Sequence, residues 1–328
     1  MCRLLGWATR EPATLLEVIG KAALCRFTAL AGLHSDGWGI AWRQPGRGVC
    51  HLKETRAADR SPAFLEIATT LRATAAIVHL RLASSGFAIS PANTHPFVAD
   101  GTAFAHNGYI PHPASLLRLL PDNETARLKG ETDSERYFAV LRTHSQGRFH
   151  PTRIQVGIAE LTRIADPFSL NCLLLTEDSL IGIAWHRRPG DPGGEAVAGY
   201  KTPDYYDMSY MYRPESFVVA SGGWQNEGWT QLPNQTGISL GLPILDGFST
   251  FPLMDGRSPG SFNSVTRLPI FNKHGCIVGT FVESVTCRLR SWSPGCPAGH
   301  RQRSRGIGCP RGSVSGMRSV RTADPGNC

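Results

Sequence analysis

A cysteine at position 2 directly follows the first methionine of the chain. Removal of Met1, which a residue as small as cysteine permits, would leave a thiol and a free α-amino group on Cys2. An α-amine titrates near ~8, so at neutral pH part of it is unprotonated and can accept the thiol proton. Cys2 would then supply both the nucleophile and the base for attack on a carbonyl carbon. Taken alone, a cysteine at position 2 is weak evidence for catalysis, because most cysteines at this position have no catalytic role.

Three further residue groups could bind a polar substrate. The guanidinium fork of Arg81 suits a carboxylate, although an arginine that ends a strand at the surface is the simpler reading. The pair Asn107-Gly108 offers an amide and an unhindered backbone, yet Asn-Gly is also a favoured hairpin turn. Asp133 offers a carboxylate just before a helical run, where an acidic residue often serves as the helix N-cap. Each signal is ambiguous by itself.

Together these segments form a pattern: MCRLLG (1–6), HSDGWG (34–39), HLRLASSG (79–86), NTHPF (93–97), FAHNGYI (104–110) and GETDSE (130–135). The pattern resembles the class II glutamine amidotransferases over roughly residues 2–240, and most of all the stand-alone bacterial members without an attached synthase domain. The resemblance implies an α+β fold, the four-layer αββα sandwich of N-terminal-nucleophile hydrolases, with the nucleophile at the start of the first strand.

The resemblance also implies a role for each residue of the pattern. Arg81 would grip the α-carboxylate of glutamine and Asp133 its α-ammonium group. Asn107 and Gly108 would donate a side-chain amide and a backbone N–H to the oxyanion, and preorganised donors of this kind stabilise developing charge. Ser84 would line the same pocket.

The segments 34–39 and 93–97 would shape the pocket near the nucleophile. For His95, a substrate contact and a structural role with satisfied ring nitrogens are both open. Synthase-coupled relatives usually carry Trp and His where this chain has Leu82 and Ser85, and relatives often carry Glu where it has Gly222. The first two departures argue against a standard synthase partnership, and we expect Gly222 to affect a loop near the pocket.

Apolar runs and turn residues predict the elements that position these side chains. We expect strands at residues 2–7, 38–43, 49–53, 75–83, 169–176, 180–186, 205–212 and 216–220. We expect helices at 62–71, 113–120, 134–144 and 152–164, and a further helical run opened by Pro12. Strands, then helices, then strands favour two packed sheets covered by helices over strict β-α alternation.

The formal net charge of +8 is concentrated at one end of the chain, since residues 251–328 hold 11 Lys/Arg and 3 Asp/Glu. We therefore expect an amidotransferase domain over 2–245. The remainder, 246–328, reads as a basic Gly/Ser/Arg-rich tail that is poorly ordered or arises from a shifted reading frame. One β-like run, 276–285, is the exception.

The predicted reaction is cleavage of the γ-carboxamide of glutamine or of a γ-glutamyl amide through a Cys2 thioester. The acceptor stays open: ammonia delivered to a separate synthase, or hydrolysis of a γ-glutamyl conjugate such as an ergothioneine precursor. The rival class is a non-catalytic, regulatory amino-acid-binding protein. We expect no cofactor, no metal site, no membrane segment and no nucleic-acid partner, and a cytoplasmic location with free thiols among the nine cysteines.

Overall fold

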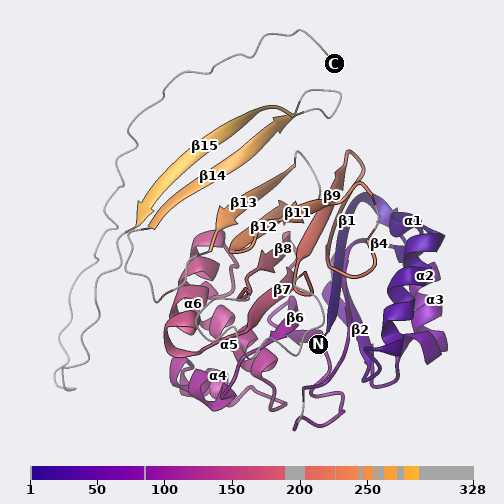
Figure 1. The fold of residues 1–328 in the computed structure, drawn as a ribbon, viewed down its shortest axis with the longest axis horizontal. Helices are drawn as coiled ribbons and strands as arrows, with labels where there is room; N and C mark the ends of the chain where they lie inside the picture. Colours follow the sequence, from indigo (N-terminus) through magenta and orange to yellow (C-terminus); the bar gives the residue numbers. More distant parts are fainter. Residues whose placement is uncertain are drawn as a thin grey trace, which may run out of the picture.

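The computed structural model describes residues 2–84, 86–188, 204–225, 227–243, 247–253 and 256, and the backbone of two strands at 262–271 and 277–287. In this part of the chain, two antiparallel sheets lie face to face between two layers of helices (Figure 1). The α+β sandwich expected from the sequence is confirmed.

The first sheet is built mainly from the N-terminal part of the chain. Its strands are β1 (Arg3–Ala13), β2 (Trp38–Gln44), β3 (Gly48–Glu54), β4 (Ala73–Leu80), β9 (Met208–Arg213), β10 (Ser216–Ser221) and β11 (Thr230–Leu232). Their order is β11-β9-β10-β1-β4-β2-β3, so β1 is an interior strand paired with β10 and β4.

The second sheet is built from the middle and later parts of the chain. Its strands are β5 (Phe97–Ala99), β6 (Thr102–Tyr109), β7 (Ser169–Leu175), β8 (Ser179–Ala184), β12 (Thr236–Gly241), β13 (Phe248–Pro252), β14 (Phe262–Phe271) and β15 (Ile277–Cys287). The order β15-β14-β13-β12-β8-β7-β6-β5 places β6 and β7 side by side, where they bring further polar residues toward the start of β1.

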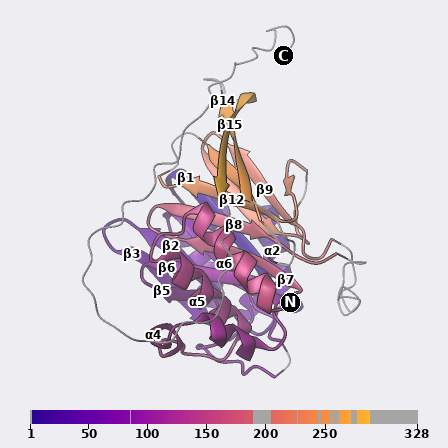
Figure 2. The ribbon, with the colours of Figure 1, turned by 90° about the vertical axis from the view of Figure 1, so that its left-hand side faces the viewer.

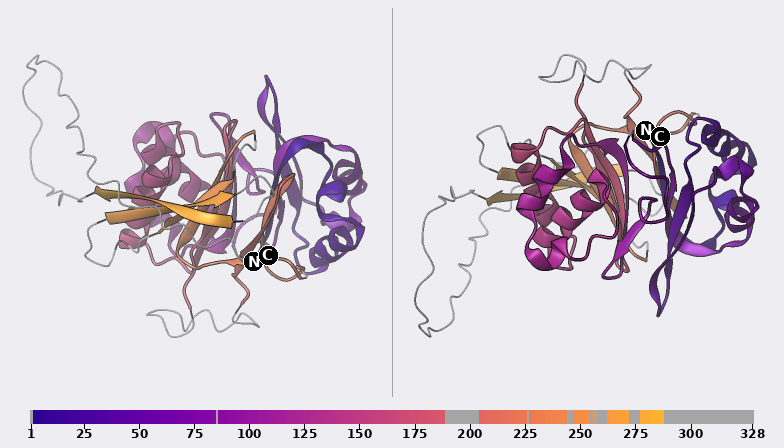
Figure 3. Two further views of the ribbon diagram at one scale, coloured as in Figure 1. Left: turned by 90° about the horizontal axis from the view of Figure 1, so that it is seen from above. Right: turned by 90° about the horizontal axis from the view of Figure 1, so that it is seen from below.

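Each sheet carries its own helices on its outer face. The helices are α1 (Leu15–Ile19), α2 (Lys21–Ala29) and α3 (Pro62–Thr70) on the first sheet, and α4 (Asp122–Thr125), α5 (Asp133–Ser145) and α6 (Pro151–Ile164) on the side of the second. Figure 2 shows α5 and α6 in front of the second sheet, and Figure 3 shows the layers from above and below.

Alternation along β1 assigns its side chains to two different cores. Leu4 and Ala8 belong to the apolar cluster between the sheets, whereas Leu5 and Trp7 pack under α1–α3. Because successive strand residues point to opposite faces, Cys2 faces the space between the sheets and Arg3 faces the helical side. The nucleophile predicted from the sequence therefore lies at the end of the inter-sheet core.

Several predicted elements differ from the structure at their ends. The helical run assigned to Pro12 begins only at Leu15, because β1 continues to Ala13, which pairs with Ala73. Thr14 then caps α1 through a reciprocal capping box with Glu17, a local signal that the apolar periodicity does not contain. The predicted helix at 113–120 is a 3₁₀ helix, Pro113–Leu119.

Strand pairing continues beyond the predicted domain end at residue 245. β13 pairs with β12, and Phe251 and Leu253 are buried in the core under α5 and α6. The β-like run predicted at 276–285 matches β15, which pairs with β14. The predicted state of residues 288–328 lies outside the described residues, and the boundary at 245 stays a prediction.

Leu173 in the core between the sheets should contribute strongly to the stability of the fold. Leu173 is fully buried there, and its Cδ1 lies 3.2 Å from the position that a Cβ on Gly6 would take. Leu173→Ala should lower the free energy of unfolding by ~2–5 kcal/mol, because it leaves a cavity between the sheets. Leu33→Ala, at a leucine 75% exposed, should change it by less than ~0.5 kcal/mol. Urea denaturation of both variants measures this, and equal losses would contradict the assigned core.

Candidate active site

The register of β1 against β4 places Cys2 beside the loop that follows β4. Arg3 pairs with Leu80, so the next residues outward are Cys2 on one strand and Arg81 and Leu82 on the other. The Cys2 Sγ lies 3.6 Å from the Leu82 carbonyl oxygen, and the residue is only 8% exposed. Burial raises the pKa of the Cys2 thiol, an effect that the nearby charge of Arg81 opposes. The thiol thus needs a base close by.

Arg81 is buried, and the hydrogen-bond partners of its guanidinium are backbone carbonyl groups. It donates to the carbonyl oxygens of Asp36 at 3.4 Å and Ala88 at 3.2 Å. Burial lowers the pKa of Arg81, while the Cys2 and Asp36 side chains act in the opposite direction. Arg81 forms no salt bridge within the described residues, so its guanidinium could still pair with a substrate carboxylate.

Asp133 supplies the opposite charge from the second sheet's side. Its Oδ2 accepts from the Ile110 N–H at 2.8 Å and its Oδ1 from the Ser134 hydroxyl at 3.3 Å. Burial raises the pKa of Asp133, and the charge of His106 opposes this shift. The N-cap of α5 is Thr132, whose side chain accepts from the Glu135 N–H, so the alternative that Asp133 is the cap is wrong.

Arg81 and Asp133 both lie within electrostatic range of Cys2, since the charge of each acts on the pKa of its thiol. No salt bridge joins the two in the described part of the chain; each is held by backbone and hydroxyl groups instead. The structure therefore holds a separated cation and anion beside a buried thiol.

Asn107 and Gly108 lie inside β6 rather than in a turn. Asn107 pairs with Asn171 and Gly108 with Leu170 of β7, which excludes the hairpin reading. The Asn107 amide is fully buried, and neither its nitrogen nor its oxygen has a hydrogen-bond partner in the described structure. A buried amide costs about 1–3 kcal/mol unless a water molecule or a ligand bonds it.

Gly108 is required by space. A Cβ there would lie 2.0 Å from the Ser169 carbonyl oxygen and 2.2 Å from the His106 Nε2. His106 itself binds the Ser169 carbonyl oxygen through Nε2 and the Ser134 hydroxyl through Nδ1, both at 2.9 Å. Any side chain at 108 would push β6 from β7 and move Asn107 with it.

Histidines tie the two sheets together at the site. The His79 Nε2 lies 3.2 Å from the His106 carbonyl oxygen, which links β4 to the residue before Asn107. His95 stacks on His79 with ring centroids 4.1 Å apart and meets Phe97 edge-on. Burial holds the pKa values of His79 and His95 well below the usual range. The shift favours the neutral form of both rings.

Neither ring nitrogen of His95 has a hydrogen-bond partner among the described residues, so no described protein group satisfies the ring. A substrate contact for His95 stays a prediction, as does a lining role for Ser84, which is half-buried in the loop after Arg81. Ser85 lies outside the described residues.

No role was predicted for Arg3 or Asp36, although both lie within the motifs of the pattern. Arg3, a cation within the apolar start of β1, donates to the Cys2 carbonyl oxygen at 3.1 Å, and its guanidinium lies 4.1 Å from the Tyr205 ring centroid. Asp36 accepts from the Ala83 N–H at 2.7 Å and so fixes the loop after Arg81.

At Gly222 a Cβ would have ordinary contacts of 3.5 Å or more, so space does not demand this glycine.

The described residues contain no cluster of three or more His, Cys, Asp or Glu side chains that could hold a metal ion. None of the described helices combines the length and apolar composition needed to cross a membrane. Cys2, Cys25, Cys50 and Cys172 carry free thiols.

The sequence of residues 1–174 matches the family model described as glutamine amidotransferases class-II. The chain belongs to this family. Its similarity to the "Probable glutamine amidotransferase DUG3" of Saccharomyces cerevisiae is 25% identity over 160 residues, which is 43% of this chain and 44% of that protein. The match thus spans less than half of this curated relative.

Solved structures share the fold. A glutamine aminotransferase class-II domain protein from Silicibacter pomeroyi aligns with a TM-score of 0.54 and 17% identity, covering 77% of this chain and 100% of that one. The glutamine phosphoribosylpyrophosphate amidotransferase of B. subtilis, complexed with ADP and GMP, aligns with a TM-score of 0.51 and 16% identity, covering 76% of this chain and 49% of that one.

Lys53 holds the backbone around His95, and its lowered pKa should make the stability of the protein depend on pH. Its Nζ donates to the carbonyl oxygens of Thr94 at 2.7 Å and Pro96 at 3.4 Å, on either side of His95. Burial lowers the pKa of Lys53 from 10.5 to about 8, although Glu135 opposes the shift. Between these two pH values the unfolded chain binds more protons than the folded one, so stability should rise with pH.

Lys53→Met removes this titration. The difference in free energy of unfolding between the wild-type protein and the variant, from urea curves at several pH values, should shift in favour of the wild type from pH 8 to 10.5. Parallel pH curves for the two proteins would show that Lys53 titrates normally.

Proposed function

We propose that this protein is a cysteine amidohydrolase that cleaves the γ-carboxamide of glutamine or of a γ-glutamyl amide, with Cys2 as the nucleophile after removal of Met1. The observation that carries the proposal is the unpaired, buried charge pair at the thiol: Arg81 and Asp133, close to Cys2 and not bonded to each other. An amino acid carries the two complementary charges on one carbon. Its α-carboxylate would bind Arg81 and its α-ammonium group Asp133.

Binding of the amino-acid end leaves the side chain to reach the thiol. The Cys2 sulfur attacks the amide carbon while its proton passes to the α-amine of the same residue. The resulting oxyanion accepts hydrogen bonds from the Asn107 amide and the Gly108 N–H. The C–N bond then breaks, the amine or ammonia leaves with the transferred proton, and a thioester remains.

Water completes the reaction. It adds to the thioester carbon, the C–S bond breaks, and glutamate leaves as the thiol is restored. Buried positioning groups convert a weak encounter into an ordered approach of sulfur to carbon. The chemistry requires no electron transfer, and every proton is accounted for by the amine, the leaving group and water.

The fate of the released nitrogen is a separate choice. Delivery of ammonia to a partner synthase and plain hydrolysis of a γ-glutamyl conjugate begin with the same thioester. Comparing glutamine with γ-glutamyl amides of larger amines distinguishes them. A preference for the larger amide by kcat/KM would favour conjugate hydrolysis.

Glutamate release by purified variants tests the proposed reaction. Cys2→Ala should abolish release from every amide, whereas Cys25→Ala, at an exposed thiol, should leave it unchanged. Asn107→Ala should lower kcat by about 10²–10³-fold, because one oxyanion donor is lost. Circular dichroism should show all three folded.

The charge pair makes a separable prediction. Arg81→Met should raise KM for glutamine far more than it lowers kcat, because it removes substrate binding. Arg118→Met, at an exposed arginine, should change neither. Full activity in Cys2→Ala, or an unchanged KM in Arg81→Met, would overturn the proposal.

A further inference from the structure

Arg3 lies at the start of β1, directly after the proposed nucleophile. The residue is only 6% exposed, and its Nη1 donates to the Cys2 carbonyl oxygen at 3.1 Å. The backbone nitrogen of Cys2 is three bonds from that oxygen, so standard covalent geometry keeps it within about 7 Å of the Nη1 atom. After removal of Met1 this nitrogen is the α-amine that, in the proposed function, accepts the thiol proton.

No carboxylate pairs with the Arg3 guanidinium within the described residues, and its Nε has no hydrogen-bond partner there. The turn at 204–207 carries Asp204 and Asp207, but its contact with the guanidinium is the Tyr205 ring, whose centroid lies 4.1 Å from the Arg3 Cζ. On another side the backbone approaches without a side chain, since a Cβ on Gly223 would lie 3.5 Å from the Arg3 Nε. Because a guanidinium stays protonated in proteins, a positive charge is kept beside the proposed nucleophile.

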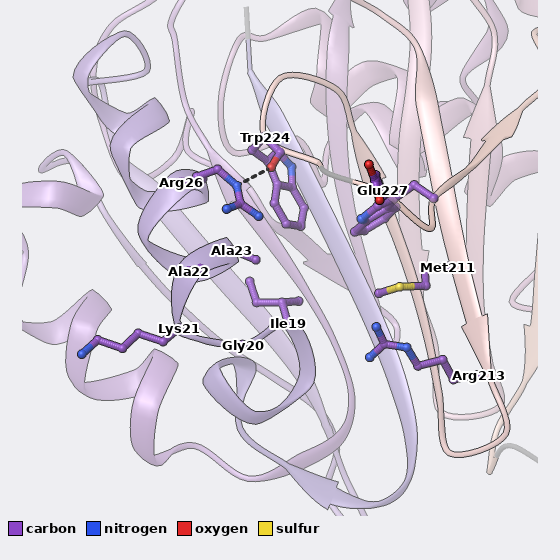
Figure 4. A pocket seen from close by; sticks show the side chains of 11 residues that line it. Ile19, Gly20, Lys21, Ala22, Ala23, Arg26, Met211, Arg213, Trp224 and Glu227 are labelled. Carbon is purple, nitrogen blue, oxygen red and sulfur yellow. Dashed lines mark hydrogen bonds between the residues drawn. The ribbon is translucent and has the colours of Figure 1, made fainter.

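The segment after β10, which faces this guanidinium, is fixed at both of its neighbours. The Ser221 hydroxyl oxygen accepts from the Leu4 N–H of β1 at 2.9 Å, and Gln225 donates to the Ser221 carbonyl oxygen at 2.8 Å. Trp224 lines a pocket beside α2, where Arg26 donates to its carbonyl oxygen at 3.0 Å (Figure 4). The surroundings of the cation are therefore built from bonded elements.

Two further charges act at Cys2 from other elements, Arg81 after β4 and Asp133 at the start of α5. For a positive charge on the Cys2 amine, Arg81 is unfavourable and Asp133 favourable. In the proposed complex the substrate carboxylate pairs with Arg81 and the substrate ammonium group with Asp133. Arg3 is then the cation beside the amine that no substrate charge neutralises.

We propose that Arg3 keeps the Cys2 α-amine unprotonated at neutral pH, so that the amine is ready to accept the thiol proton. A nearby like charge disfavours the protonated form of an amine, which otherwise titrates near ~8. The ammonium group formed by proton transfer is a stronger acid for the same reason, and it gives its proton to the leaving nitrogen as the C–N bond breaks. Arg3 thus acts through the amine and contacts no reacting atom. The proposal rests on the proposed function, because it assigns the base of that reaction.

The pKa of the amine is measured on the full chain carrying Cys2→Ala, which keeps the α-amine and removes the thiol that would titrate with it. Trace acetylation with acetic anhydride over a series of pH values, followed by the mass of the N-terminal peptide, gives the unprotonated fraction at each pH. The same masses show that Met1 is absent. The pKa should lie below about 7.5, under that of an ordinary α-amine.

Variants at position 3 separate charge from shape. In the Cys2→Ala background, Arg3→Met and Arg3→Gln should each raise the pKa of the amine by about one unit, because the like charge is lost. Arg3→Lys keeps a charge and should stay closer to the parent than to Arg3→Met. Arg10→Met removes a cation about 23 Å farther along β1, at an exposed residue, and should leave the pKa unchanged. Circular dichroism shows that each variant is folded.

With Cys2 intact, the pH profile of glutamate release gives a second readout. Arg3→Met should move the acidic limb of kcat/KM to higher pH by about one unit and lower kcat/KM about tenfold at pH 7, with recovery at alkaline pH. A loss that is equal at every pH would mean that Arg3 only supports the structure, and would overturn the inference.

The acetylation data can overturn it independently: a parent pKa at or above about 7.5, a rise of less than about half a unit in both neutral variants, or a rise in Arg3→Lys as large as in Arg3→Met. These results do not depend on amide cleavage. Absence of glutamate release by the wild-type protein would instead overturn the proposed function.

Discussion

The antiparallel pairing of β1 with β4 is the constraint on which the candidate site depends. Register alone brings Cys2 opposite Arg81, because Arg3 pairs with Leu80. A slip of one residue would turn the thiol to the helical face and would move each apolar side chain of β1 to the face opposite the one it occupies. Leu4 and Ala8 between the sheets, and Leu5 and Trp7 under the helices, hold the register by burial on both faces. The same contacts that stabilise the fold thus position the proposed nucleophile.

Buried charged and polar groups at the site lower the stability of the fold when no ligand is bound. Arg81 and Asp133 are buried without pairing, and the Asn107 amide is buried without any partner. Such groups destabilise a fold unless neighbours fix them, and here the carbonyl oxygens of Asp36 and Ala88 and the Ile110 N–H do so. In the proposed function, an amino acid with a side-chain amide satisfies all three groups at once.

Local patterns predicted much of this architecture. Alternating and continuous apolar runs indicated most strands of both sheets, and the ordered motifs indicated the family, whose nucleophile stays a prediction for Cys2. They did not indicate that Thr132 rather than Asp133 caps α5, or that Asn107 lies within a strand, because these depend on the pairing of β6 with β7. The stacking of His95 on His79 also joins residues far apart in the chain. No local period encodes such contacts, which exist only once the sheets have formed.

The central claim is that Cys2, freed from Met1, is the nucleophile of a pocket for an amino-acid amide. The most direct measurement is the mass of the N-terminal peptide after the purified protein reacts with a glutamine-mimicking diazo-ketone. The account predicts that Met1 is absent, that Cys2 carries the adduct, and that excess glutamine prevents its formation. An N-terminal peptide that retains Met1 with Cys2 unmodified, or an adduct that glutamine does not diminish, would contradict it.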